Sequence, residues 1–245
     1  MDVQQAIRSS LAQLTPMKVN GVAKIRVGGA GDGGYVMIDD LAPGPVCYSI
    51  GVGPDVSWDV DMATNRGATV HQYDHTVDAP PARHPLCRFN KVGLGDTDDA
   101  PELRRLDTLI RANGDDDRAD LILKCDIEGA EWRSLACLPQ GYFGRFDQIV
   151  MELHWLDHLH DAAFRRTWAN VIGNIYATHQ CFHIHGNNYG EIAIVHGVPV
   201  PQVVEVSFAR RAGRSFSVSD EMSPGPLDRR NREDAPDLFL GGFRF

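Results

Sequence analysis

The stretch Leu121-Ile-Leu-Lys-Cys-Asp126-Ile-Glu128-Gly129-Ala-Glu131-Trp132 is an apolar run that passes directly into three carboxylates around a glycine. The apolar part predicts a buried strand over 119–126. Because ligands bind at the carboxyl ends of strands in an open α/β sheet, the acids are expected where chemistry takes place. Two further segments have the same form, Tyr48-Ser-Ile-Gly51-Val-Gly53-Pro-Asp55 and Met151-Glu152-Leu-His154-Trp155. Three strands that end in polar residues predict a ligand site along one edge of a sheet.

Strands and helices are expected to alternate through the middle of the chain. The hydrophobic periodicity predicts strands over 46–52, 69–74, 87–92, 119–126 and 147–153, with helices over about 57–66, 101–113 and 160–179. Three more strands, over 181–185, 191–195 and 203–209, follow without intervening helices. This pattern is typical of an α/β fold: a mostly parallel sheet with helices on both faces and an antiparallel edge.

A single domain is predicted over 1–245, because 245 residues suffice for one α/β domain with a full core. Residues 1–45 are expected to form an amphipathic helix and a hairpin or lid, and residues 46–210 the core. Residues 211–245 are expected to form a loop that leads to a short docked strand.

The composition narrows the class of partner and the compartment. A net charge of −9 disfavours nucleic acid, which requires a basic surface, and favours a neutral polar substrate. The five cysteines are odd in number and lack paired metal-ligand spacing, which favours reduced thiols and a cytoplasmic protein. The start of the chain lacks the pattern of a signal peptide, and no apolar run approaches the roughly 20 residues that span a bilayer. Secretion and a membrane span are therefore not expected.

The glycine-rich segment Gly29-Ala-Gly31-Asp-Gly33-Gly34 satisfies the G-x-G-x-x-G fingerprint of dinucleotide-binding proteins. In those proteins the glycines open a helix whose N-terminus faces the pyrophosphate. Here Tyr35-Val-Met-Ile follows, which predicts a strand. A hairpin turn or lid is favoured, and an NAD(P)-dependent oxidoreductase remains the alternative.

A better nucleotide-binding loop follows the strand over 46–52. Gly51 and Gly53 let a ligand approach the backbone closely, and Asp55 and Ser57 lead into the next helix. Asp74 ends the following strand, where an acid of a Rossmann-like sheet binds ribose hydroxyls. Two glycines without a third for phosphate suit a ligand that lacks a pyrophosphate, and S-adenosylmethionine is the common one.

The acids after the next strands suggest how a hydroxyl acceptor is activated. Asp126 and Glu152 are expected on neighbouring strand ends, where they can hold Mg²⁺ on the acceptor oxygen. His154 lies on the same side of its strand as Glu152 and is the expected general base. Structural roles remain open: Asp126 as a helix cap, Glu128 and Glu131 at the positive end of a helix, and His154 as a buried histidine.

Further site residues come from the last strands. If the strand over 203–209 is antiparallel, Glu205 lies beside the carboxyl ends of the others as a third metal ligand. His185, Asn187 and Asn188 end the strand over 181–185 on the same rim and offer hydrogen bonds to the hydroxyls of a substrate.

Together these residues resemble the FkbM-like family of S-adenosylmethionine-dependent O-methyltransferases. The signature of that family is Lys, apolar, Asp, apolar, Glu, Gly, Ala, Glu, which matches 124–131. A Tyr-Ser-x-Gly-x-Gly segment matches 48–53, and an Asp-Gly-Gly-Tyr-Val segment matches 32–36.

The resemblance implies the Rossmann-like fold of class I methyltransferases. Metal-dependent relatives carry one acid after the fourth strand and another after the fifth, which match Asp126 and Glu152. The lysine that some relatives use as a base is replaced by Gly129, which shifts proton transfer to His154 or to the metal. Members that methylate the 1-OH of short 4-linked mannosides, in methylmannose polysaccharide biosynthesis, are similar in length and acidity. That similarity implies a saccharide acceptor, Mg²⁺ dependence and a homodimer.

Other functions remain open at this point. Within the same class, the acceptor is alternatively a small-molecule natural product. Outside the class, the alternatives are the oxidoreductase named above and a non-catalytic glycan-binding module.

Overall fold

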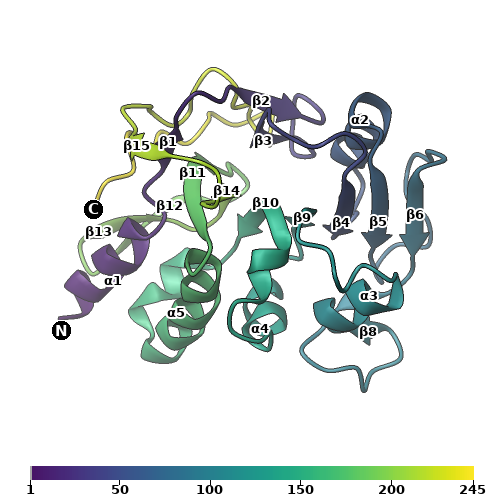
Figure 1. Ribbon diagram of the computed structural model, residues 1–245. Coiled ribbons are helices and arrows are strands. Elements are labelled where there is room, and N and C mark those ends of the chain that lie inside the picture. The colour runs from purple at the N-terminus through teal and green to yellow at the C-terminus, as the bar shows by residue number, and fades with distance from the viewer. Residues whose placement is uncertain (1) are drawn as a thin grey trace.

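A computed structural model describes residues 2–245 as one α/β fold (Figure 1). The α-helices, in chain order, are α1 (Val3–Ala12), α2 (Ser57–Arg66), α3 (Leu106–Ala112), α4 (Glu131–Ala136) and α5 (Ala162–Tyr176), with two 3₁₀ turns, η1 (Tyr142–Arg145) and η2 (Leu156–His160). The strands are β1 (Met17–Val19), β2 (Lys24–Val27), β3 (Tyr35–Ile38), β4 (Val46–Ile50), β5 (Thr69–Tyr73), β6 (Cys87–Asn90), β7 (Gly93–Leu94), β8 (Leu103–Arg104), β9 (Leu121–Cys125), β10 (Phe146–Leu153), β11 (His179–Gly186), β12 (Ile192–Val195), β13 (Val198–Pro201), β14 (Val204–Arg210) and β15 (Phe216–Val218).

The central sheet has seven strands in the order β11-β14-β10-β9-β4-β5-β6. Every neighbouring pair from β10 to β6 is parallel, whereas β14 is antiparallel to both β10 and β11. The predicted mostly parallel α/β sheet is confirmed. The predicted antiparallel edge is confirmed too, since β14 is antiparallel to β10 and to the edge strand β11, whereas β12 pairs with β13 outside the sheet.

The chain order reverses between β4 and β9, because β5 and β6 extend the sheet on one side and β9 and β10 on the other. Loops from the two strands diverge at such a switch point and leave a crevice at their carboxyl ends. The first and the fourth strands of this sheet therefore deliver their ends to one ligand site.

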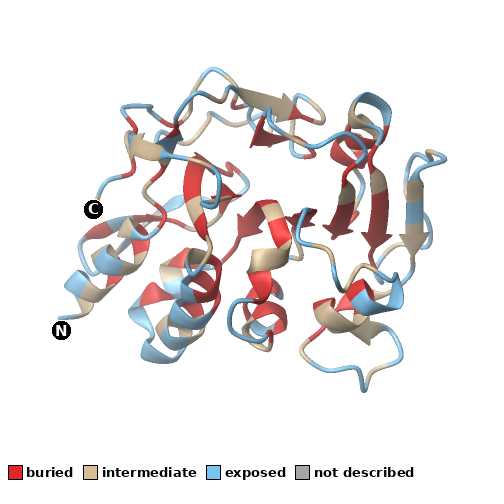
Figure 2. Ribbon diagram, in the orientation of Figure 1, coloured by how far each residue is buried: buried red, intermediate tan, exposed pale blue. Residues whose placement is uncertain are grey.

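Two layers cover the sheet (Figure 1). Helices α1, α3, α4 and α5 share one core with one face of the sheet, to which Tyr48, Leu123 and Met151 contribute. Helix α2 and the β2–β3 hairpin cover the other face, where Cys47, Ile122 and neighbouring side chains pack. Figure 2 shows the consequence: the central sheet is buried almost throughout except for its edge strand β6, while the helices expose their outer sides.

The two ends of the chain meet, since β1 pairs with β15 along Met17↔Val218 to Val19↔Phe216. The predicted docked strand after Asp237 is wrong. Among the described residues, that segment makes only two isolated bridges, Gly186↔Leu238 and Ser223↔Gly241, so it touches the edge strand β11 at a single residue without extending the sheet.

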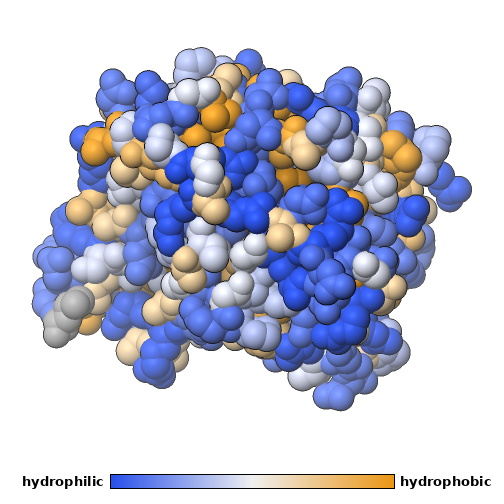
Figure 3. Space-filling view, in the orientation of Figure 1, coloured by the Kyte–Doolittle hydropathy of each residue, from blue (hydrophilic) through white to orange (hydrophobic). Residues whose placement is uncertain are grey.

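The visible face of the molecule is largely hydrophilic, with scattered hydrophobic patches (Figure 3). Within residues 2–245, no helix has the length and apolarity needed to cross a membrane. All five cysteines are free thiols.

Candidate functional site

The ends of β4 and β9 touch directly at Gly51. Its φ is +84°, and a Cβ atom there would lie 1.6 Å from the backbone oxygen of Asp126. Only glycine fits such a position. The Asp126 amide donates to the Ile50 carbonyl at 2.9 Å, which locks the glycine loop against the acid-bearing strand end.

Asp74 holds this loop in shape from the next strand. Its Oδ2 accepts the amides of Val52 and Gly53 at 3.0 Å each, and its Oδ1 accepts the amide and hydroxyl of Thr76. Although burial opposes ionisation, these hydrogen bonds keep the pKa of Asp74 below its ordinary value. The carboxylate is thus anionic but already saturated with donors, so it organises the loop, and ribose binding would require it to exchange partners.

A cavity of about 260 Å³ lies beside this loop. It is lined by Gly51, Gly53, Asp55 and Asp74 as predicted, and by the end of β9. Lys124, which the sequence left unassigned, also lines it and donates to the Gly51 carbonyl at 2.8 Å. We call this space the donor cavity.

Ser57 is not among the residues that line the donor cavity. Its hydroxyl accepts the Gly29 amide at 2.7 Å and donates to the Gly33 carbonyl at 3.0 Å, which ties the glycine-rich segment to the start of α2. That segment joins β2 to β3, paired antiparallel from Lys24↔Ile38 to Val27↔Tyr35. The hairpin prediction is confirmed, and no helix follows the glycines to face a pyrophosphate.

Four carboxylates converge beyond the donor cavity. Ligand atoms of Asp126, Glu152 and His154 lie within 4.8 Å of one another, and so do those of Asp32, Glu152 and Glu205. Glu152 belongs to both groups because it pairs directly with Glu205 across β10 and β14. The predicted antiparallel placement of Glu205 is confirmed. The predicted ligands Asp126 and Glu205, however, fall into different groups, with Glu152 between them.

The chemistry of this cluster suits a hard cation. Asp126 Oδ1 is buried without a hydrogen-bond partner, while its Oδ2 accepts the Tyr35 hydroxyl at 3.1 Å. Burial and the neighbouring Asp126 raise the pKa of Glu152 well above its ordinary value. Crowded oxygens with an unsatisfied lone pair match the oxygen ligands that Mg²⁺ prefers, so the residues fit such an ion.

His154 is held on all sides. Glu131, which is fully buried, lies 2.9 Å from the His154 Nδ1 and accepts the His154 amide at 3.0 Å. His154 Nε2 lies 3.3 Å from both Glu152 and Glu128. Burial lowers the pKa of His154, but the hydrogen bonds to Glu131 and Glu152 outweigh it and raise that pKa to about 11. This arrangement favours the imidazolium form of His154, and a role as base requires that its interactions with Glu131 and Glu152 weaken.

The sequence matches no known family profile and no curated protein. The resemblance to FkbM-like methyltransferases therefore rests on the motifs themselves.

A second cavity, of about 510 Å³, adjoins the donor cavity and shares Asp32 and Glu128 with it. Glu152, His154 and Asn187 also line it, and we call it the acceptor cavity. Of the three predicted substrate-binding residues, Asn187 alone borders this cavity. Its amide donates to Glu152 Oε1, so it also orients a carboxylate of the cluster.

His185 and Asn188 instead hold the irregular segment 224–238, which we call the C-terminal strap. His185 is fully buried, with its ring nitrogens 3.1 Å from Glu205 and 3.0 Å from Asp237. The Asn188 side chain bonds the backbone of Arg232 in both directions. These two residues lie near the cluster, but their hydrogen-bonding groups are occupied by the protein.

The strap and the hairpin supply residues that the sequence reasoning missed. Asn231 donates to Asp32 at 2.9 Å and to Glu205 at 2.6 Å, and so joins the hairpin turn to β14. Asn231 lies in an irregular tail without periodicity, so no local signal marks it. Asp32 belongs to the Asp-Gly-Gly-Tyr segment, and that motif was the signal in the sequence that could have identified Asp32 as a site residue.

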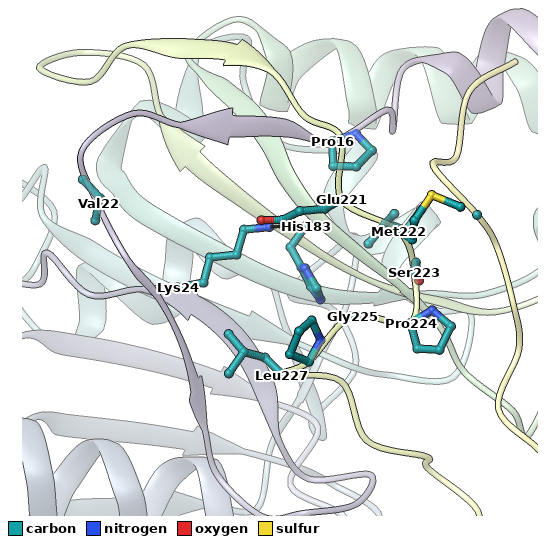
Figure 4. Close-up of a pocket in the computed structure, with 13 residues that line it drawn as sticks. Pro16, Val22, Lys24, His183, Glu221, Met222, Ser223, Pro224, Gly225 and Leu227 are labelled. Carbon is teal, nitrogen blue, oxygen red and sulfur yellow. Dashed lines mark hydrogen bonds and ion pairs between the residues drawn. The ribbon is translucent and has the colours of Figure 1, made fainter.

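A slightly larger cavity, of about 550 Å³, lies elsewhere, between the N-terminal segment and the start of the strap (Figure 4). Lys24 and Glu221 point toward each other across it, and His183 lies at its floor, 2.8 Å from Asp228. None of the clustered carboxylates lines it, so size alone does not locate the candidate site.

Proposed function

We propose that the protein is an S-adenosylmethionine-dependent, Mg²⁺-dependent O-methyltransferase that acts on a saccharide hydroxyl. The observation that carries the proposal is the meeting of two cavities at one acid cluster. A group transfer needs two ligands whose reacting atoms are in contact. In the most favourable cases, holding the two ligands in this arrangement lowers the activation free energy by roughly 7 kcal/mol or more.

The placement of the acids also agrees with what the motif resemblance implies. Asp126 follows β9, the fourth strand of the central sheet along the chain, and Glu152 lies near the end of β10, the fifth. The donor's sulfonium is a cation, and Asp32, Asp126 and Glu128 line the donor cavity. Such a site favours the charged donor over its neutral product electrostatically.

In the proposed reaction, the acceptor oxygen attacks the methyl carbon, the carbon–sulfur bond breaks, and a carbon–oxygen bond forms. The sulfur leaves as the thioether of S-adenosylhomocysteine, and the hydroxyl proton passes to a base. A bound Mg²⁺ would lower the pKa of the acceptor hydroxyl. Asp126 and Glu152 would hold it, with Glu205 and Asp32 beside Glu152. His154 is the group positioned to take the proton, provided that it has first lost the proton that its pairing with Glu131 and Glu152 favours.

The oxidoreductase alternative is disfavoured because the G-x-G-x-x-G segment forms a hairpin turn packed on itself. Calorimetric titration of the protein with S-adenosylhomocysteine and, separately, with NADH distinguishes the two classes. We expect S-adenosylhomocysteine to bind; binding of NADH alone would overturn the proposal.

Turnover is tested with 4-linked mannotriose as acceptor, and mass spectrometry detects the added methyl group. We expect Asp126→Asn to abolish methylation and its response to Mg²⁺, while affinity for the neutral product S-adenosylhomocysteine changes little. Asp99→Asn, at an exposed position outside the cluster, is the matched control. Methylation of small alcohols but of no glycan would instead support the natural-product alternative.

A further inference from the structure

The acceptor cavity carries two aromatic side chains that the proposed chemistry does not use. Trp155 is 46% exposed and Tyr189 is 62% exposed, and both line this cavity. Large aromatic residues are usually buried to a much greater degree. Two exposed aromatic side chains on one cavity indicate a ligand that covers them.

Trp155 is held in an unfavourable backbone conformation. Its φ is +62°, which costs a non-glycine residue roughly 1–2 kcal/mol. Its ring packs over Gly129, where an added Cβ would lie 2.2 Å from the Trp155 Cζ2, and it stacks on His158 at 6.0 Å. Strain that persists at a cavity next to His154 indicates a functional constraint on where this ring lies.

Tyr189 is fixed by the turn after β11. Its amide donates to Asn187 Oδ1 at 2.8 Å, and its ring lies 5.7 Å from the Arg232 guanidinium of the C-terminal strap. The same asparagine donates to Glu152, so the position of Tyr189 is coupled to the acid cluster. The ring is therefore placed by the site rather than being a loose surface side chain.

The polar lining indicates which ligand suits these rings. Asp32, Glu128, Glu152 and Asp157 contribute carboxylates, and no Lys or Arg is among the described residues that line the cavity. His154 also lines it, but its ring nitrogens are already paired with carboxylates of Glu128, Glu131 and Glu152. Carboxylates accept hydrogen bonds from hydroxyls but repel anions. A volume of about 510 Å³ lies within the roughly 300–1,000 Å³ that hold drug-sized ligands.

We infer that Trp155 and Tyr189 are the specificity-determining residues for the acceptor, an uncharged oligosaccharide whose ring faces stack on them while its hydroxyls donate to the carboxylates. This inference rests on the proposed function for the identity of the reaction. It adds the two side chains that select the acceptor and the requirement that the acceptor carry no phosphate or carboxylate.

Trp155 provides its own reporter, because the other tryptophans, Trp58, Trp132 and Trp168, are at most 3% exposed. Acrylamide therefore quenches mainly Trp155. We expect 4-linked mannotriose to protect this fluorescence saturably, whereas mannose 1-phosphate does not. Absence of protection by mannotriose, or stronger protection by mannose 1-phosphate or catechol, would overturn the inference.

Variants assign the binding to the rings. We expect Trp155→Ala and Tyr189→Ala each to weaken mannotriose binding by roughly 3- to 10-fold in calorimetry. Trp155→Phe should restore most of the loss, and S-adenosylhomocysteine affinity should not change. Phe239→Ala removes an aromatic residue that is 66% exposed outside the cavity and is the matched control. Equal acceptor affinity in all the alanine variants would refute the role of the rings.

The two proposals fail in different ways. If mannotriose does not protect the Trp155 fluorescence while S-adenosylhomocysteine still binds, only the role assigned to Trp155 and Tyr189 is refuted. Failure to bind S-adenosylhomocysteine, with mannotriose still protecting Trp155, defeats the methyltransferase and leaves a glycan-binding site.

Discussion

The charge state of His154 decides whether it can serve as a base. The variant Glu131→Gln tests whether Glu131 determines that charge state. The pKa of His154 is raised from 6.5 to about 11, with Glu131 the strongest of the groups that raise it. Removing that negative charge leaves burial and Glu152 in opposition. We expect the pKa of His154 to fall by about 2 units, or about 3 kcal/mol. The variant also places an amide near the Gly129 N–H that Glu131 Oε2 accepts at 2.9 Å, so circular dichroism must show an intact fold.

The assay is NMR titration of ring-labelled histidines in metal-free protein, with the His154 signal assigned by its loss in His154→Asn. In the native protein this signal should not titrate between pH 5 and 9. His179 is the control, because burial lowers its pKa to about 4 and Glu131 is not among the groups that shift it. A native His154 that titrates near 6.5, or one that Glu131→Gln leaves unmoved, would refute the reasoning.

The same shift fixes the sign of a pH effect on stability. The folded pKa of His154 lies above its ordinary value of 6.5, so the unfolded chain releases this proton first as pH rises. The stabilisation by the imidazolium is complete below about pH 6.5 and is lost as pH rises through about 11.

Three further outcomes are expected. Gly53→Ala, at φ +54° with open space around it, should lower the free energy of unfolding in urea by about 1 kcal/mol. Gly51→Ala should lower it by about 1–3 kcal/mol more, because the added Cβ pushes the end of β4 away from the backbone of Asp126. Equal losses in the two variants would contradict the close approach of Gly51 to Asp126. Mg²⁺ at 100 times its dissociation constant should stabilise the native protein by about 2.7 kcal/mol in thermal unfolding, and a similar gain in Asp126→Asn would remove this residue from the ion site. Asn231→Ala should weaken Mg²⁺ binding by roughly 10-fold or more in calorimetry, because it frees two of the clustered carboxylates; unchanged affinity would show that the ion lies away from Asp32 and Glu205.

Local patterns in the sequence predicted the central sheet well. The apolar runs that end in Gly51, Asp126 and Glu152 are strands, and the register places Glu205 opposite Glu152 as the antiparallel expectation required. This succeeded because side-chain alternation and strand direction are properties of short segments. The sequence did not predict the order β10-β14-β11, since the order of strands depends on which neighbours pack best rather than on any one segment.

The partners of the site residues were harder to predict. Glu131 is the first residue of α4, as the sequence suggested, but its buried carboxylate also binds His154, which the sequence did not indicate. Asn231 and Asp237 reach the cluster from an irregular strap, where no periodicity indicates which side chains face inward. Asn188 has the polar character of a ligand residue but holds that strap in place. Residue type and strand position indicate that a side chain lies near the site, whereas its hydrogen-bonding partner is set only by tertiary packing.

The acid cluster is costly to fold without a positive partner. Asp32 comes from the N-terminal hairpin, Glu205 from β14, and Asn231 from the C-terminal strap, so both ends of the chain must close to bring these groups together. Burial and repulsion from Asp126 both oppose a charge on Glu152 and raise its pKa. A fold that collects carboxylates from distant segments, and leaves one Asp126 oxygen unsatisfied, is stabilised by whatever cation enters. The proposed ligands, a divalent ion and a sulfonium, are both cations, so the same concentration of negative charge that opposes folding would favour binding of both.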